Sequence, residues 1–195
     1  MNATNLRYAD VVDAASTFLQ TYNPSGNLPV PIEEIIELQM KIVIVVVPGI
    51  KTLLGIDAFI SSDFSQITVD EHAFTVYPER TKFSLAHEVG HFILHAEWYK
   101  KHGTQTLDDY LSFHDRIDPE TYKYFEIQAS TFAGLVLVPR EALFDELKNR
   151  IGKIPSEENL EILLPVMQDI LEVFQVSGEV LLRRMQREKI IRLKW

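Results

Sequence analysis

The chain has 195 residues, of which 46% are hydrophobic and 24% are charged. This length and composition are typical of one globular domain, with or without a small appendage. The chain has no cysteine, which excludes disulfides, thiolate zinc sites and cysteine nucleophiles, and which fits a reducing compartment. The net charge of −9 argues against broad nucleic-acid binding.

Positive charge is concentrated at the C-terminal end, where residues 183–195 hold six Lys or Arg and one Glu. A solvated helix face is the simpler explanation, and a local contact with nucleic acid stays open. The N-terminus lacks a basic region followed by an apolar stretch, and the most apolar run, 42–48, is too short to span a bilayer. We therefore expect a cytoplasmic protein without a membrane segment.

The apolar residues predict elements in chain order. Helical spacing covers residues 6–22, and Pro31 suits the first turn of a second helix. A run of β-branched residues at 41–47, followed by 55–61 and 66–71, predicts a small sheet, in which residues 66–71 offer an edge strand for an extended peptide. Helices are predicted at 80–98, at about 120–138, at 140–150 and around Pro165, and Ser177 is a plausible cap of the last helix.

Residues His87-Glu88-Val89-Gly90-His91 match the pattern H-E-x-x-H inside the predicted helix 80–98. Side chains four residues apart lie on one helical face, so His87 and His91 can converge on one metal ion. Glu88 is rotated by roughly 100° from His87, where it can reach a metal-bound water without binding the metal. The alternative is a helix whose histidines are unrelated to each other.

A third histidine, His95, lies eight residues after His87. On a helix that separation is about 12 Å, so the two cannot share an ion. We predict that His95 packs in the core or supports a ligand from behind. Leu94 and Glu97 occupy the positions where a metzincin would have its glycine and its third histidine, which excludes that pattern.

A catalytic zinc keeps three protein ligands and one open position, so a third ligand must come from elsewhere. The candidates that follow the helix are His102, His114, Asp115, Glu120 and Glu126. Spacing favours Glu126, because its helical neighbours at 129, 130 and 133 are small and would let this helix approach another closely. Gly90 offers a matching gap between the two histidines.

Three stretches, taken together, give the chain a family resemblance. They are "RTKFSLAHEVGHFILH" at 80–95, "EIQASTFAGLVLVP" at 126–139 and "FQVSGEVLLRRM" at 174–185. With these stretches the sequence resembles the ImmA/IrrE metallopeptidases, regulatory proteins of bacteria and their mobile elements. The first two stretches are specific as a pair, and the third is weak alone. The chain departs from the family pattern at Lys82, Ser130 and Val180, where Arg, Asn or Asp, and Ala are usual.

The resemblance implies that His87, His91 and Glu126 bind Zn²⁺ and that Glu88 is the catalytic acid and base. It also implies an α+β fold with a small three-stranded sheet, a zincin-like pair of metal-binding helices and a C-terminal portion resembling a helix-turn-helix. We place the metallopeptidase domain at 1–150 and the helical C-terminal segment at 151–195. The departure at Ser130 concerns the hydrogen bonds behind the ligands more than the ligands themselves.

The function expected from these residues is zinc-dependent endopeptidase activity. By resemblance, the substrate would be a helix-turn-helix repressor encoded nearby, whose cleavage relieves repression. Tyr122, one turn before the expected ligand, or His114 could donate to the developing oxyanion. The alternatives are a module that binds DNA or a partner through its basic C-terminal segment, and a toxin–antitoxin or phage component that binds a repressor without cutting it.

Overall fold

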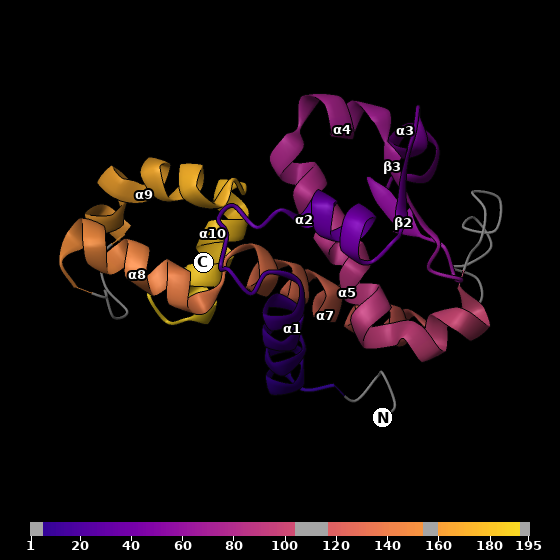
Figure 1. Cartoon of the computed structure of the whole chain (residues 1–195), viewed down its shortest axis with the longest axis horizontal. Helices are drawn as coiled ribbons and strands as arrows, with labels where there is room; N and C mark the ends of the chain where they lie inside the picture. Colours follow the sequence, from indigo (N-terminus) through magenta and orange to yellow (C-terminus); the bar gives the residue numbers. More distant parts are fainter. Residues whose placement is uncertain (1–5, 104–116, 154–159, 192–195) are drawn as a thin grey trace.

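The structure is a computed structural model that describes residues 6–103, 117–153 and 160–191. The helices are α1 (Tyr8–Tyr22), α2 (Ile32–Glu34) with a π-helical continuation η2 (Ile35–Gln39), α3 (Ile50–Leu54), α4 (Glu71–Val76), α5 (Pro78–His102), α7 (Pro119–Leu137), α8 (Arg140–Ile151), α9 (Leu160–Phe174) and α10 (Gly178–Arg187). The strands are β1 (Val43–Val47), β2 (Ala58–Ile60) and β3 (Gln66–Asp70). The fold is α+β and mostly helical, as predicted (Figure 1).

The sheet has the strand order β1-β3-β2, with β1 parallel and β2 antiparallel to β3. The three strands lie where the sequence predicted them, but the prediction that residues 66–71 form an edge strand is wrong. After a short turn β3 pairs back with β2, and its other side pairs with β1, so Thr68 lies opposite both Val45 and Phe59. The central position buries Ile67 and Val69 completely. The edge strand that borders α5 is β2.

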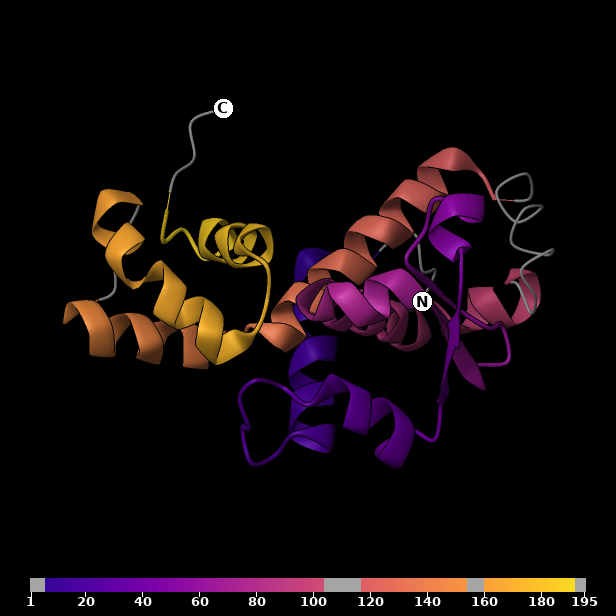
Figure 2. The ribbon, with the colours of Figure 1, turned by 90° about the horizontal axis from the view of Figure 1, so that it is seen from above.

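Helix α5 lies between the sheet and α7 (Figure 2). It starts at Pro78 and runs for 25 residues, beyond the predicted range 80–98 at both ends. Asp118 caps α7, because its carboxylate accepts hydrogen bonds from the backbone N–H groups of the first turn. The two helices approach closely at Gly90, where an added Cβ would lie 3.1 Å from both the Cα and the carbonyl oxygen of Ala129. The small residues of both helices therefore allow the close contact that the sequence predicted.

Two short helices were not predicted. Helix α3 lies between Gly49 and Gly55, which both adopt positive φ angles that glycine tolerates best. Helix α4 follows β3 directly and is capped by Asp70, whose carboxylate accepts a hydrogen bond from the N–H of Ala73. Each helix has at most six residues, too few to show an apolar period in the sequence.

The helices α8, α9 and α10 group at the end of the molecule away from the sheet (Figure 1). The predicted cap of α10 is present, since Ser177 Oγ accepts from the N–H of Val180. Arg184 of α10 is buried and donates to the carbonyl oxygen of Val138, just after α7, at 3.1 Å. The division at residue 150 stays a prediction, and α8, which precedes it, lies with α9 and α10. No helix in the described ranges is long and apolar enough to cross a bilayer.

The contact of α5 with α7 predicts that Gly90→Ala destabilises the protein. The new methyl group meets backbone atoms of Ala129, which cannot rotate away, so the helices must separate. We expect a loss of about 1–3 kcal/mol in the free energy of unfolding, measured by urea denaturation. Gly178→Ala is the control, because nothing lies within 4 Å of its added Cβ. Equal stability of Gly90→Ala and the wild type would contradict the close contact.

Candidate functional site

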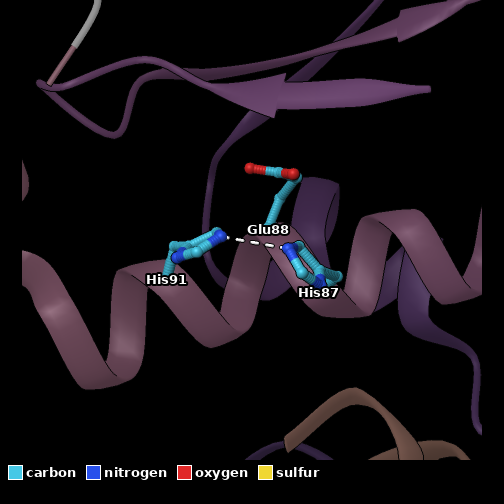
Figure 3. A group of neighbouring side chains, drawn as sticks. All are labelled: His87, Glu88 and His91. Carbon is cyan, nitrogen blue, oxygen red and sulfur yellow. Dashed lines mark hydrogen bonds between the residues drawn. The ribbon is translucent and has the colours of Figure 1, made fainter. Parts of the chain in front are cut away.

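A cleft of about 330 Å³ lies between the edge strand β2 and the helices α5 and α7. Helix α5 contributes His87, Glu88 and His91 to its wall, and α7 contributes Glu126. Figure 3 shows the two imidazole rings of α5 turned toward each other and the Glu88 side chain rising from the helix toward the strands. The nearest ligand atoms of His87, Glu88 and His91 lie within 4.8 Å of one another.

The two histidines and Glu126 converge on one point. The Nε2 atoms of His87 and His91 are 3.0 Å apart. The carboxylate oxygens of Glu126 lie 3.2 Å from His87 Nε2 and 3.3 Å from His91 Nε2. Ligands about 2.0–2.1 Å from a tetrahedral zinc ion are separated by roughly 3.3 Å, so this donor set fits such an ion. Two imidazole nitrogens and one carboxylate are also ligand types that zinc binds in proteins.

Burial and mutual contact prepare these three side chains to bind a cation. Burial raises the pKa of Glu126, but its hydrogen bonds and charge interactions with His87 and His91 outweigh burial and hold that pKa well below its usual range. Burial lowers the pKa of His91, which leaves this imidazole neutral at pH 7. Burial also opposes protonation of His87, yet the nearby carboxylates of Glu126 and Glu88 raise its pKa overall. An ionised carboxylate thus faces at least one neutral imidazole.

Glu88 occupies a different position from these three residues. Its Oε2 accepts a hydrogen bond from the backbone N–H of Ile60 in β2 at 2.9 Å. Burial raises the pKa of this carboxyl to about 8, against the opposing influence of His87. A cation bound beside it would favour the ionised form. The side chain is therefore fixed next to the candidate metal position and can exchange a proton near neutral pH.

The other nitrogen of each imidazole contacts the protein interior. Ser130 Oγ lies 3.2 Å from His87 Nδ1, so the residue that departs from the family pattern does form a hydrogen bond behind a candidate ligand. His95 Nδ1 lies 3.1 Å from His91 Nδ1. The His95 ring is buried and stacks on Phe125 at 4.1 Å, so it both packs in the core and contacts a candidate ligand, as predicted.

The remaining candidate ligands do not reach this point. Among those described, His102 and Glu120 do not line the cleft. His114 and Asp115 lie outside the described residues. Tyr122, the predicted oxyanion donor, lines the cleft, and so does Tyr99, which the sequence did not single out. The ring of Tyr99 lies 5.0 Å from that of His91, two turns along α5, and this spacing could have pointed to it.

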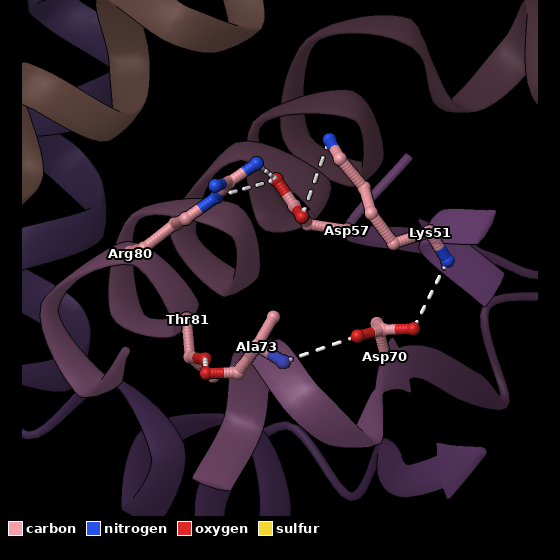
Figure 4. Close-up of polar contacts among 6 residues, drawn as sticks. All are labelled: Lys51, Asp57, Asp70, Ala73, Arg80 and Thr81. Atoms are coloured by element: carbon pink, nitrogen blue, oxygen red, sulfur yellow. Dashed lines mark hydrogen bonds and ion pairs between the residues drawn. The ribbon is translucent and has the colours of Figure 1, made fainter. Parts of the chain in front are cut away.

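A polar network fixes the edge strand against α5 (Figure 4). Asp57, which directly precedes β2, accepts hydrogen bonds from Nε and Nη2 of Arg80 at 2.8 and 2.7 Å. Lys51 Nζ lies 3.4 Å from the other oxygen of Asp57, and the Lys51 N–H donates to Asp70 at 3.0 Å. Thr81, beside Arg80, donates to the carbonyl oxygen of Ala73. These contacts connect the start of β2 with the start of α5, and so connect two walls of the cleft.

Comparisons with known proteins identify the family of the chain. Residues 66–186 match the sequence model of a peptidase family described as the IrrE N-terminal-like domain. The chain belongs to this family. Membership in the IrrE N-terminal-like family supports a metallopeptidase-type role, and the match includes all four residues of the candidate site. No match was found among curated proteins.

A solved structure shares the fold of this member of the IrrE N-terminal-like family. It is a Mycobacterium tuberculosis transcriptional regulator with a TM-score of 0.57 and 15% sequence identity. The alignment covers 93% of this chain and 48% of the regulator, so the chain spans about half of the regulator's length. At this identity the likeness shows the fold alone.

The raised pKa of Glu88 predicts a pH-dependent cost to stability in the metal-free protein. The carboxyl has a pKa of about 8 when folded, against its usual value of 4.5 in the unfolded chain. Between these values the unfolded chain releases a proton that the folded protein retains, so stability falls as the pH rises. Glu88→Gln removes this effect and should stabilise the metal-free protein by roughly 2–4 kcal/mol at pH 8.

The measurement is urea denaturation in the presence of a chelator at pH 5 and pH 8. The advantage of Glu88→Gln should be small at pH 5 and large at pH 8. Glu97→Gln on the same helix is the control, because the Glu97 side chain is 88% exposed. An advantage that does not change with pH would contradict the assignment.

Proposed function

We propose that the protein is a zinc-dependent endopeptidase in which His87, His91 and Glu126 hold the metal and Glu88 is the general base. The observation that carries this proposal is the convergence of two Nε2 atoms and one carboxylate, separated by 3.0–3.3 Å, at the wall of an open cleft. Glu88 lies beside them with a separate anchor on β2. A closed structural site would leave neither the cleft nor a free role for Glu88.

The chemistry follows from the positions of the side chains. A zinc ion in this site would polarise the scissile carbonyl and lower the pKa of a water molecule. Glu88 would take the proton of that water and deliver it to the leaving amine. The N–H of Ile60 holds one carboxylate oxygen of Glu88, which leaves the other available for proton transfer.

The substrate is proposed to bind as an extended peptide along β2. Asp57 accepts a main-chain hydrogen bond from Asp70 and Ser61 donates one to Gln66, so the main-chain groups of Ala58 and Ile60 point to the opposite edge. At that edge the N–H of Ile60 holds Glu88, which leaves the main-chain groups of Ala58 and the carbonyl group of Ile60 to pair with a peptide. These residues line the cleft beside Glu88. Main-chain pairing with a strand edge binds peptides with little demand on their sequence. This binding surface replaces the one expected at residues 66–71, which the central position of β3 excludes.

The proposed substrate is a helix-turn-helix repressor encoded beside the gene, and cleavage would relieve repression in the cytoplasm. The support for this substrate is the family resemblance, and a fold shared with a transcriptional regulator is compatible with it. The peptide-binding edge requires an extended segment, so the cut would fall in a linker of the repressor that can leave its folded domains.

Tyr122 is proposed as the donor to the oxyanion. It lies one helical turn before Glu126 and lines the same cleft. Tyr122→Phe should lower kcat by about 10²–10³-fold and leave zinc affinity unchanged, since only the hydroxyl is lost. Steady-state kinetics on the cleaved repressor measures this effect. An unchanged kcat would show that another residue donates to the oxyanion. The other predicted donor, His114, lies outside the described residues.

The test of the proposed function is Glu88→Gln incubated with the repressor encoded beside the gene. The variant should bind one zinc ion per chain, as the wild type does, and cleave the repressor at least 10³-fold more slowly. Metal analysis and gel electrophoresis of the products measure both quantities. Glu97→Gln is the matched control and should cleave normally. Cleavage by Glu88→Gln at the wild-type rate would reject the mechanism.

The alternative function is repressor or DNA binding without cleavage through the C-terminal segment. Three of the described basic side chains of that segment have partners within the chain. Arg183 pairs with Glu179, Arg184 is buried against Val138, and Arg187 lies over the ring of Tyr8. These contacts favour the endopeptidase. Relief of repression that survives Glu88→Gln would instead support the binding function.

A further inference from the structure

A buried chain of hydrogen bonds leads from the candidate ligand His91 to the main chain of the N-terminal segment. We propose that His95 and Gln128 are positioning residues that use the carbonyl group of Leu6 to fix the tautomer of His91. The inference rests on the proposed function in one respect, that His91 binds the metal through Nε2. Its geometry lies entirely in the metal-free protein.

The direction of the chain is set at its far end. The Leu6 carbonyl oxygen can only accept a hydrogen bond. Gln128 Nε2 lies 3.2 Å from it and donates. The amide of Gln128 therefore presents its other atom, the acceptor Oε1, to His95 Nε2 at 2.8 Å. His95 must carry its proton on Nε2 to complete this bond, which leaves a lone pair on its Nδ1.

The same logic continues to the metal position. His95 Nδ1 lies 3.1 Å from His91 Nδ1, and a lone pair on the first requires a proton on the second. His91 then has its own lone pair on Nε2. That atom faces His87 and Glu126 at 3.0 and 3.3 Å, where a metal ion would bind. An acceptor on the main chain thus selects the tautomer of His91 that can bind a metal.

Burial makes other proton arrangements unfavourable. His91, His95 and Gln128 are at most 6% exposed, so water cannot replace a lost partner. Every buried side-chain nitrogen and oxygen among the described residues has a hydrogen-bond partner. The Glu126 carboxylate, 3.3 Å from His91 Nε2, is a competing acceptor that favours a proton on that nitrogen in the metal-free protein. Moving the proton there would leave the Nδ1 lone pairs of His91 and His95 face to face in a buried site, which is costly.

The second imidazole lacks this control. His87 Nδ1 contacts Ser130 Oγ at 3.2 Å, and a hydroxyl can either donate or accept. Ser130 therefore accommodates both tautomers of His87, whereas Gln128 and Leu6 permit one tautomer of His91. Gln128 also bonds across 122 residues of sequence, which connects the segment before α1 with the interface of α5 and α7.

The experiment compares isosteric side chains at position 128. Gln128→Glu keeps an acceptor toward His95, and Gln128→Met has a similar volume but no acceptor. The metal-free proteins, labelled with ¹⁵N-histidine, are studied by two-bond ¹H–¹⁵N correlation spectra, which report the tautomer of each ring. Zinc affinity is then measured by competition with a chelator of known affinity. His95→Phe is a further variant that retains the ring stacked on Phe125.

We expect the wild type and Gln128→Glu to show His91 protonated on Nδ1 and His95 protonated on Nε2. Gln128→Met and His95→Phe should show a mixture of His91 tautomers and a zinc affinity about 10–100-fold weaker. Folded Gln128→Met and His95→Phe proteins with unchanged His91 signals, or an equal loss of affinity in Gln128→Glu and Gln128→Met, would overturn the proposal. The spectra need no enzymatic activity, so a failure to cleave a repressor would reject the proposed function and leave this inference standing.

Discussion

The close approach of α5 and α7 at Gly90 is the constraint on which the candidate site depends. Zinc-binding histidines four residues apart can be supplied by one helix, but the third ligand must come from a second helix at nearly backbone-to-backbone distance. Gly90 lies between the two histidines, and Ala129 lies one turn after Glu126, so the point of contact and the candidate ligands coincide. A larger residue at either position would move the carboxylate away from the imidazoles.

This packing also explains the charges in the site. The interface of α5 with α7 buries His91, and the packing of α5 on β2 buries Glu88, which disfavours the charged forms of both. The same interface brings Glu126 against both imidazoles, which keeps that carboxylate ionised. The metal-free protein therefore holds a partly buried anion next to a neutral imidazole, and a dication would relieve the imbalance. On the other wall, Asp57 and Arg80 keep β2 in place, so the anchor of Glu88 does not shift.

The sequence predicted what depends on local spacing. The H-E-x-x-H pattern located two imidazoles and Glu88 on one helix, and the small face after Glu126 located its partner helix. The strand order could not be predicted from the sequence. β3 pairs with one parallel and one antiparallel strand, and no local sequence pattern distinguishes a short central strand from an edge strand. The hydrogen bonds Arg80–Asp57 and Gln128–Leu6 could not be predicted either, since they join residues 23 and 122 positions apart and no sequence motif connects the partners. The family match extends to 186 and includes parts of the C-terminal helices, which local patterns alone could not assign.

The central claim is that helices α5 and α7 together supply three ligands to one zinc ion. X-ray absorption spectroscopy of the zinc-loaded protein tests it most directly, with Glu126→Ala as the comparison. The account predicts two imidazole nitrogens at about 2.0–2.1 Å together with oxygen ligands, and a loss of one oxygen ligand or of bound zinc in Glu126→Ala. An identical spectrum and zinc content in Glu126→Ala, or a third imidazole in the shell, would contradict it.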